Sequence, residues 1–206
     1  MHPEETAFPT IGILALQGDY DAHCRILREL GATPKLVRAA PDLEGLQGLI
    51  IPGGESTVMS RLCDRYDLTQ PLKQHIEAGL PTLGTCAGLI FLAKTIEGGS
   101  ANFPQSTLGV LDVSVTRNAY GAQADSFETD LFVPELEQSI RAVFIRAPRI
   151  EAIGADVEVL ANYQQAPVLV RQGSIVALAF HPEIAGESRV HKLWLEALVK
   201  NGSSSS

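Results

Sequence analysis

The sequence predicts a single α/β domain of three layers, with a mostly parallel central sheet flanked by helices. In the first half, short and nearly all-apolar segments alternate with amphipathic helical segments, which is typical of buried parallel strands. From Leu108 onward, short segments alternate apolar and polar residues and follow each other closely, as half-exposed strands do. We therefore expect antiparallel additions to the sheet in the C-terminal half, within one domain of this 206-residue chain.

The first half repeats a strand–helix unit. Residues 10–18 form an apolar run that ends in glycine, and the helix after it has an acidic start and a C-terminal glycine. The expected strands are residues 10–18, 33–39, 46–52 and 81–86, and the expected helices are residues 19–32, 56–65, 69–78 and 87–96.

The second half is expected to contain six further strands and a closing amphipathic helix. The strands are residues 108–118, 127–133, 142–148, 157–163, 166–173 and 174–183, and the helix is residues 187–200. Residues 1–9 are interpreted as a flexible extension, residues 10–200 as the domain and residues 201–206 as a flexible Gly/Ser tail.

Composition and charge favour a cytoplasmic protein. The net charge of −8 argues against nucleic acid as a partner, and no apolar run is long enough to span a membrane. The N-terminal residues lack the charged-then-apolar pattern of a secretory signal. The cysteines form no C-x-x-C pair, so neither a disulfide framework nor a zinc site is indicated. Cys24 and Cys63 lie at helical spacing and are interpreted as ordinary helix residues.

The third cysteine, Cys86, lies in a G-x-C-x-G pattern between an expected strand and an expected helix. This is the cysteine form of the nucleophile elbow, in which small residues are needed two positions either side of a strained nucleophile. The turn places the thiol at a helix N-terminus, where the helix dipole stabilises a thiolate. The backbone N–H of Ala87 is then expected to face an oxyanion. The alternative is a small-residue turn with a packed cysteine, and the strand–turn–helix setting favours the nucleophile.

A thiolate nucleophile needs a base, and His181 is the best candidate. It ends an apolar run, and Glu183 follows two residues later across a proline, so the two side chains are expected to point to the same side. The carboxylate would then orient the imidazole, as the acid of a Ser-His-Asp triad does. Of the other histidines, His2 is assigned to the flexible N-terminal extension, and surface or solvated positions are expected for His23, His75 and His191.

A glycine-rich loop, Pro52-Gly53-Gly54-Glu55-Ser56, ends another buried strand and is expected at the same edge of the sheet. Its glycines allow a ligand to approach the backbone, and the Gly54 N–H is a candidate second oxyanion donor. The alternatives are a phosphate-cradling loop or a plain turn. The loop lacks the lysine of a Walker motif.

Taken together, these motifs resemble a known family. The segments "IGILALQGD", "GLIIPGGESTVMSRL", "GTCAGLIFLAK", "TRNAYGAQADSFE", "VFIRAPRI" and "AFHPEI" occur in this order. The single motifs are similar to the class I (triad) glutamine amidotransferases, and the ordered set resembles the glutaminase subunits of pyridoxal 5'-phosphate synthase. The resemblance spans residues 11–199, and residues 98–105 depart from it as a slightly lengthened loop.

The resemblance implies the chemistry in detail. Cys86, His181 and Glu183 would hydrolyse L-glutamine to L-glutamate and ammonia, with Gly54 and Ala87 as oxyanion donors and with no metal or organic cofactor. The implied glutamine-binding residues are Gly53, Gly54, Glu55, Arg117, Ile145 and Arg146. From the residues themselves, an arginine suits the substrate carboxylate, and Glu55 suits the ammonium group directly or by orienting an arginine.

The resemblance also implies a partner, a synthase subunit that makes pyridoxal 5'-phosphate from ribose 5-phosphate and glyceraldehyde 3-phosphate. Two alternatives remain open at this point. One is a glutaminase subunit of another synthase, such as imidazole glycerol phosphate synthase, which "PGGEST" together with "RNAYG" disfavours. The other is a non-catalytic cysteine sensor or chaperone on a similar sheet, which would not need the His181–Glu183 pair.

Overall fold

A computed structural model of the chain describes residues 8–98, 105–117 and 126–202. Its centre is a seven-stranded sheet with the order β10-β11-β12-β4-β3-β1-β2. The strands are β1 (Thr10–Leu14), β2 (Thr33–Val37), β3 (Gly48–Ile51), β4 (Thr82–Thr85), β10 (Glu158–Tyr163), β11 (Ala166–Gln172) and β12 (Ile175–Leu178). The five strands from β12 to β2 pair in parallel, whereas β10 and β11 pair antiparallel at one edge. The predicted fold class is thereby confirmed.

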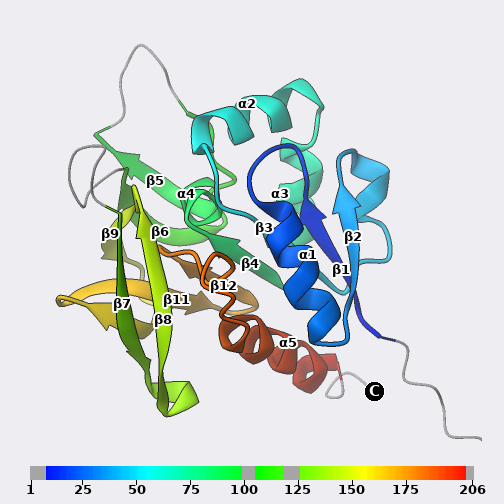
Figure 1. The fold of residues 1–206 in the computed structure, drawn as a ribbon. Coiled ribbons are helices and arrows are strands. Elements are labelled where there is room, and N and C mark those ends of the chain that lie inside the picture. The colour runs from blue at the N-terminus through cyan, green and yellow to red at the C-terminus, as the bar shows by residue number, and fades with distance from the viewer. Residues whose placement is uncertain (1–7, 99–104, 118–125, 203–206) are drawn as a thin grey trace, which may run out of the picture.

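Helices cover the sheet on both faces, as Figure 1 shows. They are α1 (Tyr20–Glu29), α2 (Ser56–Arg65), α3 (Thr69–Glu77), α4 (Ala87–Leu92) and α5 (Arg189–Gly202), with short 3-10 turns η1 (Ala40–Leu43) and η2 (Pro134–Leu136). The chain moves outward from β1 to β2 and then reverses through β3 to β4. Because βαβ crossovers are right-handed, this reversal puts α1 on one face and α2 and α3 on the other. The core between these layers is apolar, and Ile11, Leu49 and Ile50 are fully buried.

The remaining strands form two smaller sheets. One contains β5 (Ala93–Glu97), β6 (Leu111–Thr116) and β9 (Arg149–Ile153), and the other is the hairpin of β7 (Ser126–Val133) and β8 (Gln138–Ile145). The expected strands of the second half are thus present, but only β10, β11 and β12 extend the central sheet. Pairing partners of this kind are set by tertiary packing, which a strand pattern does not encode.

Several expected elements differ from the structure, and strand β9 has no counterpart among the expected elements. The helix expected over residues 87–96 ends at Leu92, and Ala93–Glu97 is strand β5, whose Thr95 and Ile96 pair with β6. These β-branched residues fit a pleated surface better than a helix. The strand expected over residues 10–18 ends at Leu14, which leaves Gln17 and Gly18 in a loop at the end of the sheet. Within the described ranges, none of the helices is long and apolar enough to cross a membrane.

Candidate active site

Three loops meet at one edge of the central sheet. They follow β1, β3 and β4, which are neighbours in the sheet, and they contain Gln17, the Gly53-Gly54 pair and Cys86. Because parallel strands end at the same edge, side chains that are far apart in the sequence gather there. A pocket of about 150 Å³ opens at this point. It is lined by Gly54, Glu55, Ser56, Cys86, Ile90, Arg117, Ile145, Arg146 and His181.

Cys86 has the backbone geometry of a nucleophile elbow. It lies between β4 and α4 with φ of 47° and ψ of −98°, a combination that costs a non-glycine residue free energy. The Cys86 N–H donates to the Leu178 carbonyl oxygen at 2.8 Å, which holds the turn against β12. A Cβ atom at Gly88 would collide with the backbone carbonyl of Ile51. The small residue two positions after the cysteine is therefore required by close backbone approach.

His181 and Glu183 form a buried pair. His181 Nδ1 lies 2.7 Å from Glu183 Oε1, and the two residues are only 7% and 4% exposed. The pair forms within a turn rather than in an extended segment, because β12 ends at Leu178 and residues 182–186 are in a turn. The carboxylate fixes Nδ1 as the protonated nitrogen, which leaves Nε2 for Cys86.

The electrostatics of the site favour a charged imidazole. Burial by itself would lower the pKa of His181, but hydrogen bonding and charge from Cys86 and from Glu183 raise it to about 10. A charged imidazole beside the cysteine can serve as the proton donor in nucleophilic catalysis. The Gly53 backbone packs against the same imidazole, since a Cβ at Gly53 would collide with His181 Cε1.

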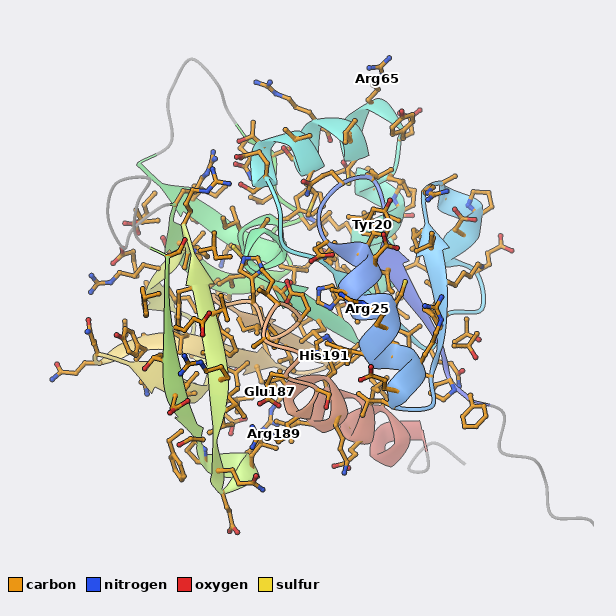
Figure 2. The ribbon with its side chains drawn as sticks, viewed as in Figure 1. Tyr20, Arg25, Arg65, Glu187, Arg189 and His191 are labelled. Carbon is orange, nitrogen blue, oxygen red and sulfur yellow. The ribbon has the colours of Figure 1, made fainter. Side chains whose placement is uncertain are left out.

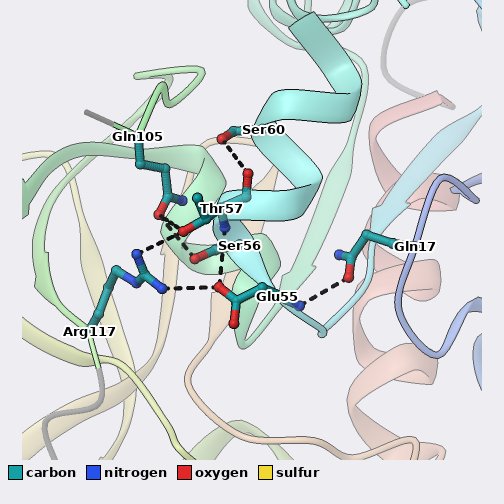
Figure 3. A network of polar contacts seen from close by, with 7 residues as sticks. All are labelled: Gln17, Glu55, Ser56, Thr57, Ser60, Gln105 and Arg117. Atoms are coloured by element: carbon teal, nitrogen blue, oxygen red, sulfur yellow. Dashed lines mark hydrogen bonds and ion pairs between the residues drawn. The ribbon is translucent and has the colours of Figure 1, made fainter. Parts of the chain in front are cut away.

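The open side of the pocket carries a polar network, drawn in Figure 3. Arg117 donates from Nη2 to Glu55 Oε1 at 3.0 Å and from Nη1 to Thr57 Oγ1 at 2.9 Å. Gln105 Oε1 accepts from the hydroxyl groups of Ser56 and Thr57 at 3.2 and 3.3 Å. Glu55 therefore orients an arginine here, which is one of the two roles that its sequence position suggested.

Each of the other predicted residues has a definite place. Gly54 lines the pocket with φ of 144°, and Ala87 is the first residue of α4, directly after Cys86. Ile145 accepts a weak hydrogen bond from Cys86 Sγ at 3.9 Å through its carbonyl oxygen, and Arg146 lines the pocket with φ of 44°. Asn118 to Gly121 of the "RNAYG" segment lie outside the described residues.

The other two cysteines are packed helix residues, as expected. Cys24 and Cys63 are 5% and 0% exposed on α1 and α2. Burial raises the pKa of both thiols, that of Cys63 to about 12. Among the described residues, no group of three or more His, Cys, Asp or Glu side chains is placed to hold a metal ion.

Sequence reasoning missed Gln17 and was wrong about two histidines. Gln17 Oε1 accepts from the Glu55 N–H at 3.0 Å and lies against Gly54, so it braces the glycine-rich loop. Its place in a glycine-containing turn after a buried strand was the available signal. His23 and His191, expected on solvated surfaces, are both 0% exposed. The two rings contact each other, with centroids 5.1 Å apart, which a helical pattern alone does not reveal.

The fold and the site define a class of protein: a doubly wound α/β domain with a cysteine at a nucleophile elbow and a histidine–carboxylate pair beside it. Comparison with known proteins identifies the family. The model of the SNO glutamine amidotransferase family matches residues 13–200, and the chain belongs to that family.

Individual relatives agree with this assignment. "Pyridoxal 5'-phosphate synthase subunit PdxT" of Nocardioides sp. is 48% identical over 95% of this chain and 98% of that protein. The protein of the same name from Thermosipho africanus is 45% identical over 92% of this chain and 99% of that protein. A solved structure described as a glutamine amidotransferase superposes with a TM-score of 0.85 at 47% identity, covering 91% of this chain and 98% of that one.

Proposed function

We propose that this chain is the glutaminase subunit of a pyridoxal 5'-phosphate synthase, in which residues 10–200 form the glutamine amidotransferase domain. The observation that carries the proposal is the placement of Cys86 and the His181–Glu183 pair at one pocket. The family match and relatives named as synthase subunits support it. A non-catalytic cysteine sensor would have no use for a buried, oriented imidazole beside its thiol. The synthase relatives favour this partner over imidazole glycerol phosphate synthase.

The first half of the reaction forms a thioester. The Cys86 thiolate attacks the side-chain amide carbon of glutamine, and the N–H groups of Gly54 and Ala87 stabilise the tetrahedral oxyanion. The His181 imidazolium then donates its Nε2 proton to the amide nitrogen, and the C–N bond breaks to release ammonia.

The second half regenerates the enzyme. Neutral His181 takes a proton from water, and the resulting hydroxide attacks the thioester carbonyl. Glutamate leaves and the Cys86 thiolate returns beside the His181 imidazolium. Throughout, Glu183 holds Nδ1 and stabilises the charge that the imidazole gains and loses.

Substrate selection falls to the open side of the pocket. The guanidinium groups of Arg117 and Arg146 provide the charge for the α-carboxylate of glutamine, and Glu55 orients Arg117. Gly53, Gly54 and the Ile145 backbone border the reacting amide. A glutamine whose α-carboxylate is held in this way has its side chain directed at Cys86.

The ammonia has to reach a second protein before water protonates it, because ammonium is not nucleophilic. The acceptor is the synthase subunit, and docking activates this chain. The Gly53-Gly54 peptide is the switch: Gly54 adopts a φ that glycine tolerates best, so the peptide rotates at low steric cost. Until the partner fixes it, the Gly54 N–H faces away from the oxyanion. All three cysteines are free, which fits a reducing, cytoplasmic compartment.

The test compares glutamine hydrolysis with and without the synthase subunit at matched concentrations, with ammonia as the readout. Loss of one oxyanion donor typically lowers turnover by about 10²–10³-fold, so the isolated chain should be nearly silent. A glutamine-directed alkylating analogue should label Cys86 and spare Cys24 and Cys63. Equal turnover in both samples would refute the switch, and absence of any glutaminase activity in the complex would refute the function.

A further inference from the structure

Behind the active site, the buried histidines His23 and His191 form a chain that leads to Glu183. We propose that His23 is a positioning residue for catalysis: its Nε2 edge lies against the Glu183 carboxylate and the Thr85 hydroxyl group, and His191 holds the opposite edge of the His23 ring. This proposal rests on the triad of the proposed function. It adds two positioning residues, His23 and His191, behind the triad.

The geometry connects three distant segments. His23 on α1 lies with Nδ1 2.8 Å from Nε2 of His191 on α5. Its Nε2 lies 3.8 Å from Glu183 Oε1 and 3.4 Å from Oγ1 of Thr85, the residue before the nucleophile. Figure 2 labels His191 at the start of α5, where that helix passes α1. The ring of His23 therefore contacts both the acid of the triad and the strand end that carries Cys86.

The Nε2 edge of His23 makes one hydrogen bond, with Thr85 Oγ1 at 3.4 Å, because its distance of 3.8 Å from Glu183 Oε1 is too long for one. The His23 ring therefore limits where the Glu183 carboxylate can move and keeps a polar edge beside it. At the opposite edge, His23 Nδ1 and His191 Nε2 share one hydrogen bond. The backbone of Glu187 contacts the ring of His191 in turn and raises its pKa.

Both imidazoles are neutral in this arrangement. Burial lowers the pKa of His23 well below its usual range, and the neighbouring His191 and His181 lower it further. Burial also lowers the pKa of His191 to about 4, although Glu187 acts in the opposite direction. A neutral ring beside the Glu183 carboxylate restricts its position without forming a second ion pair that would compete with the His181 imidazolium.

A purely structural role explains the pair less well. Two apolar side chains would join α1 to α5 without the free-energy cost of burying polar rings. Glu183 Oε2, moreover, has no hydrogen-bond partner, so the orientation of this carboxylate depends on what contacts Oε1. Those contacts are His181 at 2.7 Å and His23 at 3.8 Å. Without His23, the carboxylate is free to rotate away from the imidazole.

Two substitutions at His23 separate the two roles. In His23→Gln the side-chain amide reaches the former Nε2 position and keeps a polar group against Glu183 and Thr85. In His23→Asn the amide reaches only the former Nδ1 position and keeps the contact with His191. We expect kcat of the synthase complex to fall about tenfold in His23→Asn with KM nearly unchanged, and to stay within about threefold of wild type in His23→Gln.

A second readout is the rate of Cys86 alkylation by iodoacetamide as a function of pH, followed by peptide mass spectrometry. The midpoint should move to higher pH in His23→Asn, because a rotating carboxylate stabilises the imidazolium less, and should stay near wild type in His23→Gln. His75→Asn and His75→Gln, on the partly exposed face of α3, are the matched controls.

Equal effects of the two His23 variants, or a milder effect of His23→Asn, would overturn the proposal and leave a structural contact between α1 and α5. If either variant fails to fold, His191→Gln and His191→Asn test the same chain one step further back. His191→Gln keeps a hydrogen-bonding group toward His23 and should retain the wild-type profile, whereas an unchanged profile in His191→Asn would overturn the proposal. Loss of labelling at Cys86 in the wild-type protein would instead refute the triad itself.

Discussion

The polar contacts on the two sides of Cys86 differ in how far they are exposed to solvent. On the open side, Glu55 and Arg117 form an ion pair whose side chains are 44% and 33% exposed, in a network of short polar side chains. On the buried side, the His181–Glu183 pair and the His23–His191 pair are almost completely enclosed. Water and substrate are alternative partners on the open side, whereas on the buried side only His181, at the edge of the pocket, can reach them.

Because of this difference in exposure, we expect the open side to bind the substrate and the buried side to carry out the chemical steps. A half-exposed ion pair is screened by solvent and contributes little to stability, so it can be rearranged when glutamine enters. A buried imidazole–carboxylate pair is costly to break because water cannot replace the lost partner. Variants on the open side should therefore change KM, and variants on the buried side should change kcat and the pH dependence.

The largest effect is expected where the two sides meet, at the nucleophile. Cys86→Ala should lower glutamine hydrolysis in the complex by about 10⁴-fold or more, because no other described cysteine faces the pocket. His181→Asn should cost nearly as much, and the double variant should be no worse than either single variant. Thermal unfolding checks that the fold persists, and Cys63→Ala is the matched control. Residual turnover near wild type in Cys86→Ala would contradict the assignment.

Glu183→Gln tests the buried side and should have the next largest effect. The amide oxygen can still accept from His181 Nδ1, but the negative charge that stabilises the imidazolium is lost. We expect kcat to fall by between about 10²- and 10⁴-fold, with a smaller change in KM. Steady-state kinetics of the complex measures both constants. If kcat of the variant equalled that of the wild-type protein, Glu183 would not be the third member of the triad.

Arg117→Lys tests the open side. Lysine keeps the charge but cannot contact Glu55 and Thr57 at the same time as a planar guanidinium does. KM for glutamine should rise about tenfold, while kcat changes much less. Arg65→Lys, an exposed arginine at the end of α2, is the control. A fall in kcat with KM unchanged would place Arg117 among the groups that act on the transition state.

The smallest effect concerns stability and pH on the buried side. The pKa values of His23 and His191 are lowered in the folded protein, so the unfolded chain binds more protons below pH 6.5. The free energy of unfolding should therefore decrease as pH falls from 6.5 toward about 4, by up to about 1.4 kcal/mol per pH unit for each histidine. Urea unfolding at several pH values measures this slope, which should be shallower in His191→Leu. Lys192→Gln, an exposed neighbour on α5, is the control, and equal slopes in all three proteins would contradict the buried neutral pair.

The sequence by itself determined the elements that depend on local pattern. Alternating apolar strands and amphipathic helices indicated the doubly wound sheet, and G-x-C-x-G with its strand–turn–helix setting placed Cys86 at an elbow. The spacing of His181 and Glu183 across a proline predicted a pair that the structure forms within a turn. Each of these features is encoded within a few neighbouring residues.

Only the tertiary structure decided what lies behind and around those residues. His23 and His191 are separated by 168 positions, and each looks like a surface residue on its own helix. They become buried because α1 and α5 bring the two rings together, with His23 Nδ1 2.8 Å from His191 Nε2. The division of the later strands into two small sheets, and the Glu55–Arg117 pair across 62 positions, likewise depend on packing between distant segments. The local secondary-structure propensity of the residues does not predict such contacts, because their free energy arises only when the chain has folded.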